Sequence, residues 1–152
     1  MRERLLYMVT LSCIFLMLMG CASATLDTYQ PKSPDEEAII RVLRINEETL
    51  QNRDLSGHLA TYHDNASIMI FFSNEGRPLV LKERYAEWVP TSVGWGEKGG
   101  KFAGIKIIVS GDTATIKGTH TSSGGYSSPH TIVMEKENGI WLITNWSFGR
   151  YS

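Results

Sequence analysis

The sequence predicts a single α+β domain in which two or three N-terminal helices pack on a strongly curved antiparallel sheet. Apolar residues recur at helical spacing mainly before about residue 62. After that point, β-rich segments alternate with turn residues such as Gly111-Asp112 and Asn138-Gly139. Helices followed by a run of strands is the order of an α+β domain. The helices then have one place to bury their apolar faces, the concave side of the sheet.

The first helix is predicted over residues 34–52. Ser33 can cap it, Pro34 suits its first turn, and Glu36 completes a capping box. Asp54 can cap a second, short helix over residues 55–62. A third segment of helical character covers residues 82–89.

Strands are predicted over residues 66–72, 78–81, 102–110, 113–122, 130–136 and 140–148. The first is almost wholly apolar, so we expect both of its faces to be covered. Alternation along the later strands places His120 on the same face as core residues, and it places Asn145 and Ser147 on the face of Trp141 and Ile143. We therefore expect these three polar side chains to point into the concave side.

The N-terminus carries an export signal. Arg2 and Arg4 precede 15 apolar or small residues, too few for a membrane-spanning helix, and Leu18-Met19-Gly20-Cys21 follows. These four residues resemble a bacterial lipobox, which implies cleavage before Cys21 and a lipid on its thiol. Cleavage after Ala24, at an Ala-x-Ala site, is the alternative and would release a soluble protein. Residues 1–20 are thus assigned to the signal, 21–33 to the lipidated cysteine and a tether, and 34–152 to the domain.

The composition of the processed chain excludes several classes of function. Removing residues 1–20 leaves 13 basic and 15 acidic residues, so no basic excess supports nucleic-acid binding. With Cys13 removed and Cys21 lipidated, no thiol remains for a disulfide, a cysteine metal site or cysteine catalysis. The four histidines lack the spacing of a metal site, and Phe102 stands where a phosphate-binding loop needs Ser or Thr. We expect no cofactor and no metal.

Three segments carry a family resemblance: residues 53–66, with Asp54-Leu55 and Tyr62-His63-Asp64-Asn65-Ala66; residues 110–116, with Gly111-Asp112; and residues 137–143, with Gly139-Ile140-Trp141-Leu142-Ile143. In order and spacing they resemble the superfamily of nuclear transport factor two, ketosteroid isomerase and the SnoaL-like polyketide cyclases. The resemblance covers about residues 34–150 and implies a cone-shaped fold with a pocket on its inner face. That fold hosts enzymes, binders and oligomerisation modules, so it leaves function open.

The isomerase chemistry of that superfamily needs an aspartate base and an oxyanion hole built from a tyrosine and a protonated acid. By the resemblance, the tyrosine position falls at Asn46 and the base at Ile70. The third position falls within residues 128–134, which contain no acid. All three roles are vacant, so we expect no proton shuttling of that type.

A different set of residues could serve the pocket. His120 is the candidate general base, because its reference pKa lies near neutrality. The predicted ligand-binding residues are Tyr62, Tyr85, Trp88, His120, Asn145 and Ser147. His58 and His130 are expected at the surface, and Trp95 is expected to be exposed in a glycine-rich loop.

The favoured hypothesis is a membrane-anchored lipoprotein of the bacterial cell envelope, on the periplasmic face of the outer membrane. Its domain binds a small apolar or aromatic ligand without catalysis, or acts as a dimeric interaction module through its sheet. The alternative is a small-molecule lyase, isomerase or hydrolase that uses His120. A purely structural envelope component is the third reading.

Overall fold

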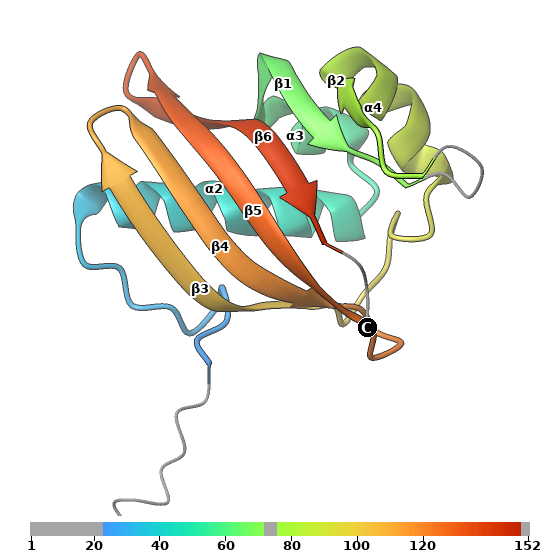
Figure 1. Cartoon of the computed structure of the whole chain (residues 1–152), viewed down its shortest axis with the longest axis horizontal. Helices are drawn as coiled ribbons and strands as arrows, with labels where there is room; N and C mark the ends of the chain where they lie inside the picture. The colour runs from blue at the N-terminus through green and yellow to red at the C-terminus, as the bar shows by residue number, and fades with distance from the viewer. Residues whose placement is uncertain (1–22, 72–75, 150–152) are drawn as a thin grey trace, which may run out of the picture.

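The computed structural model describes residues 23–71 and 76–149, which form helices packed on a curved six-stranded mixed sheet (Figure 1). The strand order is β2-β1-β6-β5-β4-β3. The strands are β1 Tyr62–Met69, β2 Leu79–Leu81, β3 Lys101–Ser110, β4 Thr113–Thr121, β5 Ser127–Glu137 and β6 Ile140–Phe148. The α+β prediction is confirmed, with one refinement: β1 pairs with β6 in parallel, whereas the other pairings are antiparallel.

The long helix α2, Pro34–Gln51, crosses one face of the sheet (Figure 1). The Ser33 hydroxyl accepts the backbone N–H of Glu36 at 3.1 Å, as expected of an N-cap. The two shorter helices are α3, Leu55–Ala60, and α4, Lys82–Trp88, and α4 runs directly into the 3₁₀ turn η1, Val89–Thr91. Both lie at the end of the sheet that carries β1 and β2 (Figure 1).

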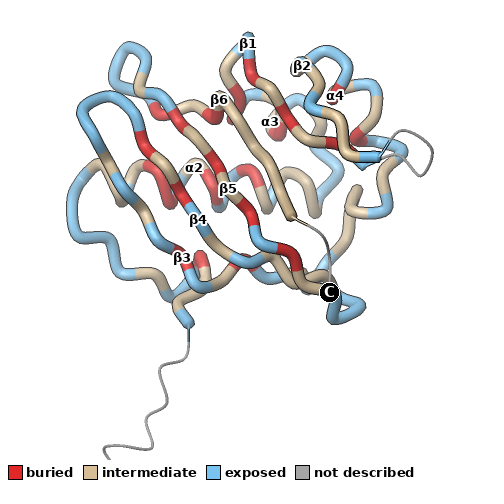
Figure 2. Tube along the Cα trace, in the orientation of Figure 1, coloured by how far each residue is buried: buried red, intermediate tan, exposed pale blue. Residues whose placement is uncertain are grey.

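The core lies between α2 and the concave side of the sheet. Along β4 and β5 buried and less buried positions alternate, as Figure 2 shows. The inward side chains are almost fully buried: Ile116, Ile132, Met134, Trp141 and Ile143. The structure therefore confirms the inward face that alternation predicts for β4 and for the first part of β6.

Strand β1 differs from its prediction. It begins at Tyr62, directly after α3, and only alternate residues such as Ala66 and Ile68 are buried. Phe71, just beyond its end, is 52% exposed. The expectation that both faces are covered is wrong, because the described helices α2, α3 and α4 pack on the same, inner face of the sheet.

The segment assigned to a tether is partly packed on the domain. Thr25 forms a bridge with Ala103 on β3, and Leu26 is only 5% exposed. The Arg44 guanidinium donates to the Leu26 carbonyl at 2.6 and 3.0 Å. The export signal and Cys21 lie outside the described residues. Within 23–71 and 76–149, no helix combines the length and the apolar character that crossing a bilayer demands.

Candidate ligand-binding cavity

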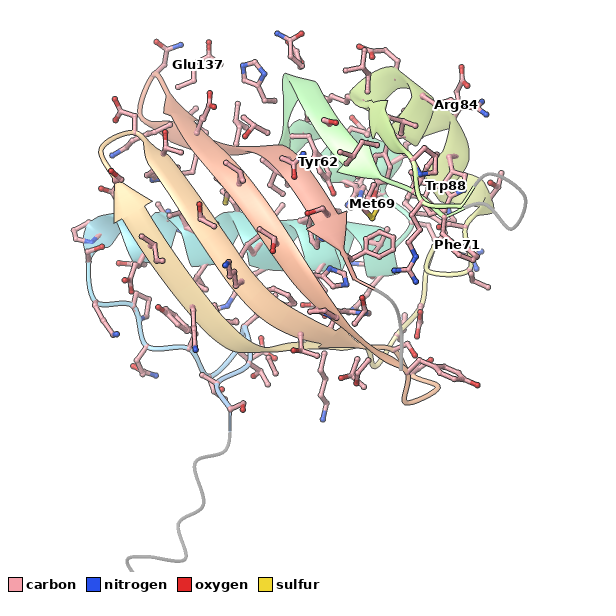
Figure 3. All side chains as sticks on the ribbon, in the orientation of Figure 1. Tyr62, Met69, Phe71, Arg84, Trp88 and Glu137 are labelled. Carbon is pink, nitrogen blue, oxygen red and sulfur yellow. The ribbon has the colours of Figure 1, made fainter. Side chains whose placement is uncertain are left out.

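A cavity of about 1530 Å³ opens between the inner face of the sheet, the helices and the loop of residues 92–100. Apolar and aromatic side chains dominate its wall, which is typical of small-molecule sites. Of the predicted ligand-binding residues, Tyr62, Tyr85, Trp88 and His120 line it. Tyr62 and Trp88 are labelled in Figure 3, where Tyr62 lies at β1 and Trp88 at the end of α4.

Asn145 and Ser147 do not line the cavity, so the prediction that they point into it is wrong. The β5–β6 register pairs Met134 with Ile143 but Val133 with Asn145, which leaves Thr144 as an extra residue. Such a bulge shifts the alternation by one position. Trp146 and Phe148 therefore face inward in place of the two polar residues.

A buried polar network forms part of the cavity wall. His58 Nδ1 lies 3.0 Å from the backbone carbonyl oxygen of Asn46, which can only accept, so Nδ1 carries the proton. His58 Nε2 then accepts the hydroxyl proton of Tyr85 at 2.9 Å. The Asn46 amide donates to the Thr61 hydroxyl at 2.7 Å. Every ring nitrogen of His58 is thus partnered, and the network fixes the tautomer of the imidazole.

Burial sets the protonation states of this network. It lowers the pKa of His58 to about 4, although the carbonyl of Asn46 and the charge of Asp54 act in the opposite direction. Burial also raises the pKa of Tyr62 to about 12 and raises the pKa of Tyr85 well above its usual value. At neutral pH His58, Tyr62 and Tyr85 are therefore uncharged.

A second buried histidine lies on β5. The Trp146 indole N–H donates to His130 Nδ1 at 2.8 Å. Because indole can only donate, His130 Nδ1 is unprotonated and the neutral ring carries its proton on Nε2. The Phe148 ring stacks on this imidazole with centroids 5.4 Å apart. Burial, followed by the charge of His120, lowers the pKa of His130 to about 3.

His120 on β4 lies beside His130, with ring centroids 5.5 Å apart. Burial lowers its pKa, and the charge of Glu97 opposes that effect. Among the described residues, His120 Nδ1 and His130 Nε2 are buried polar atoms without a hydrogen-bond partner. A buried polar atom without a partner costs about 1–3 kcal/mol. His120 and His130 both line the cavity, and each leaves one hydrogen-bonding nitrogen unsatisfied.

Sequence reasoning misplaced His58, His130 and Trp95. His58 is 1% exposed and His130 is 8% exposed, whereas both were expected at the surface. Trp95 is half-buried, lines the cavity and meets the His58 ring edge-on at a centroid distance of 6.4 Å. The one sequence signal for His130 was its place two residues before Ile132 on an alternating strand, because the two share a face.

The mouth of the cavity is formed by loops. The Glu97 carboxylate accepts both the backbone N–H and the hydroxyl of Ser123, at 2.6 and 2.7 Å. These bonds join the loop of residues 92–100 to the turn between β4 and β5. Three exposed apolar side chains belong to the same rim: Phe71, Val93 and Tyr126.

The positions that the isomerase resemblance leaves vacant are filled by structural side chains. Asn46 is buried in the polar network, and Ile70 is fully buried in the core. Glu47 on α2 does reach the cavity wall, and its pKa is raised by burial and by the charge of Asp27. Across residues 23–71 and 76–149, no group of three or more His, Cys, Asp or Glu side chains is placed to hold a metal ion.

Neither a protein-family model nor a curated protein matches the chain. Solved structures do match its fold. An NTF2-like protein of unknown function from Shewanella baltica has a TM-score of 0.65 at 15% identity, covering 80% of this chain and 97% of its own. A protein of unknown function with a cystatin-like fold from Nostoc punctiforme has a TM-score of 0.63 at 18% identity, covering 79% and 93%. An NTF2-like protein of unknown function from Silicibacter pomeroyi has a TM-score of 0.64 at 14% identity, covering 81% and 100%. The domain therefore has the NTF2-like, cystatin-like fold, and this likeness fixes the fold alone.

Proposed function

We propose that this NTF2-like domain binds a small apolar or aromatic molecule in its cavity and does not transform it. The observation that carries the proposal is the cavity of about 1530 Å³, lined mainly by aromatic and aliphatic side chains with a few polar atoms. Aromatic rings lie next to one another along its wall. The centroid of the Tyr62 ring is 5.5 Å from that of Tyr85 and 6.4 Å from that of Trp146. Such a wall stabilises a flat apolar ligand through burial and edge-to-face contacts.

The test is a titration of the full chain with 2-methylnaphthalene, in which tryptophan fluorescence and calorimetry measure binding. Leu50→Trp narrows the cavity from α2, because Leu50 lines it and is half-buried. Ile45→Trp is the matched control, since Ile45 lies on the same helix, is exposed and does not line the cavity. We expect saturable binding that Leu50→Trp weakens at least tenfold and Ile45→Trp leaves unchanged. Equal behaviour of the two variants would refute binding in the cavity.

Catalysis by His120 is the second candidate function. Its support is the position of His120 in the cavity wall together with its lowered pKa, which keeps the ring neutral at pH 7 and able to accept a proton. The test uses the molecule that co-purifies with the full chain from its native host. A change of its mass over time with the wild-type protein, absent with His120→Ala, would establish the enzyme and overturn the binding-only proposal.

The membrane anchor is part of the same proposal. A lipid on Cys21 would lie four residues before Thr25, which is bridged to β3, so the domain would sit within roughly 14 Å of the bilayer surface. Metabolic labelling with a radioactive fatty acid should be lost in Cys21→Ser. Density-gradient fractionation should place the labelled protein with the outer membrane. Labelling that persists in Cys21→Ser would contradict the anchor.

A dimer through the outer face of the sheet is the remaining alternative, taken from the family resemblance. That face includes Ile108 on β3, which is 66% exposed. Sedimentation of the full chain should show a dimer that Ile108→Lys weakens, with Ile45→Lys at an exposed position of α2 as the control for a change of charge. A monomer at all concentrations would exclude this role.

A further inference from the structure

We propose that the ligand is anchored by one uncharged hydroxyl oxygen held between His130 and His120. This inference rests on the proposed binding function and specifies its polar contact. The oxygen would accept the Nε2–H of His130 and donate its own proton to Nδ1 of His120. The two nitrogens are the buried side-chain atoms that lack partners in the described part of the chain.

The proton positions follow from the neighbours of His130. Trp146 donates to Nδ1, so the neutral ring can only present a donor at Nε2. Phe148 stacks on the ring at an interplanar angle of 26°, and Phe102 meets it edge-on with centroids 6.0 Å apart. These contacts hold the imidazole in one orientation, so its unpaired donor has a fixed direction.

The sheet register brings His120 into place as the second partner. His130 pairs with Gly118, and His120 pairs with Ser128. The two histidines therefore lie on the same face of adjacent strands, two residues apart along the strand direction. Their ring centroids are 5.5 Å apart, and the two nitrogens form no hydrogen bond with each other. One oxygen atom between the rings can serve both nitrogens.

The surroundings favour an uncharged oxygen over an anion. The rings nearest the pair are those of Phe102, Trp146 and Phe148, which supply no positive charge. The guanidinium of Arg77 lies over the Phe71 and Phe148 rings and donates to the Gly149 carbonyl, whereas the negative charge of Glu97 acts on His120 itself and opposes a second anion there. Both imidazoles are held neutral by burial. An alcohol or phenol on an apolar body fits these conditions, and a carboxylate does not.

The experiment compares three probes with one aromatic body: 2-naphthol, 2-methylnaphthalene and 2-naphthoate. We expect the full chain to bind 2-naphthol at least fivefold more tightly than 2-methylnaphthalene, and 2-naphthoate most weakly. His130→Phe and His120→Phe should each abolish the preference for 2-naphthol while retaining the binding of 2-methylnaphthalene. His63→Phe is the control, because His63 lies on β1 near Glu137 and does not line the cavity.

Nitrogen NMR of the wild-type protein supplies a readout that needs no variant to fold. The signals of His130 Nε2 and His120 Nδ1 should shift on saturation with 2-naphthol and stay in place with 2-methylnaphthalene. Equal affinity for these two probes would overturn the hydroxyl assignment while the binding function stands. If 2-naphthoate binds most tightly, the group held between the two histidines is an anion, and the assignment of an uncharged hydroxyl is overturned. Binding of none of the probes would refute the proposed function itself.

Discussion

Two buried histidines couple the stability of the domain to pH. The pKa of His58 is about 4 and that of His130 about 3, against about 6.5 in the unfolded chain. Below pH 6.5 the unfolded state therefore binds more protons than the native state, and the free energy of unfolding falls as the pH falls. Between pH 7 and pH 5 we expect a loss of about 2 kcal/mol for each histidine. Urea unfolding at the two pH values measures it.

The pH window separates this effect from the titration of exposed carboxylates, which lies lower. His63→Gln is the control, because the His63 side chain is partly exposed and faces the Glu137 carboxylate at 3.5 Å. The pH dependence that remains in this variant is the part that the buried histidines carry. An unfolding free energy that is constant from pH 7 to pH 5 would show that His58 and His130 are not buried in neutral form.

The Tyr85 hydroxyl stabilises the domain through its hydrogen bond to His58. In Tyr85→Phe the ring remains, but His58 Nε2 loses its donor and becomes a buried acceptor without a partner. We expect the free energy of unfolding to fall by about 1–3 kcal/mol. Tyr126→Phe, at an exposed tyrosine, should leave it unchanged. A loss below about 0.5 kcal/mol for Tyr85→Phe would mean that water replaces the hydroxyl.

Single strands explain which site residues the sequence could predict. Along β4 the alternation is regular, so His120 was placed correctly from its spacing to Ile116. Along β6 the extra residue Thr144 reverses the faces of everything that follows it. Thr144 carries no mark of a bulge in the sequence, because the cause is the pairing with β5 and not the residue itself. Asn145 and Ser147 were therefore predicted inward and Trp146 was missed.

For helix α3 the sequence predicted the N-cap correctly but not which side chains are buried. Its cap was readable, and Asp54 accepts the N–H of Gly57 at 2.9 Å as expected. The burial of His58 could not be predicted, because a helix of six residues is too short to define an apolar face. His58 is buried by its partners Asn46 and Tyr85, which come from other elements. A long-range network of this kind leaves no local pattern.

The β5–β6 hairpin depends on its turn. Asn138 and Gly139 have φ values of 51° and 82°, the two left-handed residues of a type I′ turn. Gly139→Ala places a side chain in that conformation, so we expect a loss of about 1 kcal/mol in the free energy of unfolding. Gly94→Ala is the control, because Gly94 has ordinary backbone angles and open space around it. Equal stability of the two variants would contradict the turn assignment. Thermal and urea unfolding measure the difference.

At the scale of the whole molecule, the order of elements predicts the architecture because each layer must bury an apolar face. Helix α2 has nowhere to bury Ile39 and Leu43 except against the sheet, and the later strands pair in sequence through short turns. The parallel contact of β1 with β6 joins segments about eighty residues apart. The cavity arises where these parts meet, so its contents depend on tertiary register that no local pattern encodes.

At the cavity mouth, one carboxylate joins the loop of residues 92–100 to the turn between β4 and β5. Glu97 is the acceptor of both hydrogen bonds that tie the loop of residues 92–100 to Ser123. Glu97→Ala removes both bonds, whereas Ser123→Ala removes the hydroxyl and keeps the backbone N–H. We expect 2-naphthol to dissociate faster from Glu97→Ala, with a smaller increase for Ser123→Ala, because the loop samples open states more often.

Stopped-flow fluorescence with 2-naphthol measures these rates. Because Glu97 is only half-buried and its bonds compete with water, the free energy of unfolding should change by less than about 1 kcal/mol in either variant. An unchanged dissociation rate in Glu97→Ala would show that the ligand leaves by another route, past the exposed Phe71 side of the rim. If both hydrogen bonds hold the loop, 2-naphthol should dissociate fastest from Glu97→Ala, more slowly from Ser123→Ala and most slowly from the wild-type protein. The intermediate rate is expected because the backbone N–H of Ser123 still reaches Glu97 in Ser123→Ala.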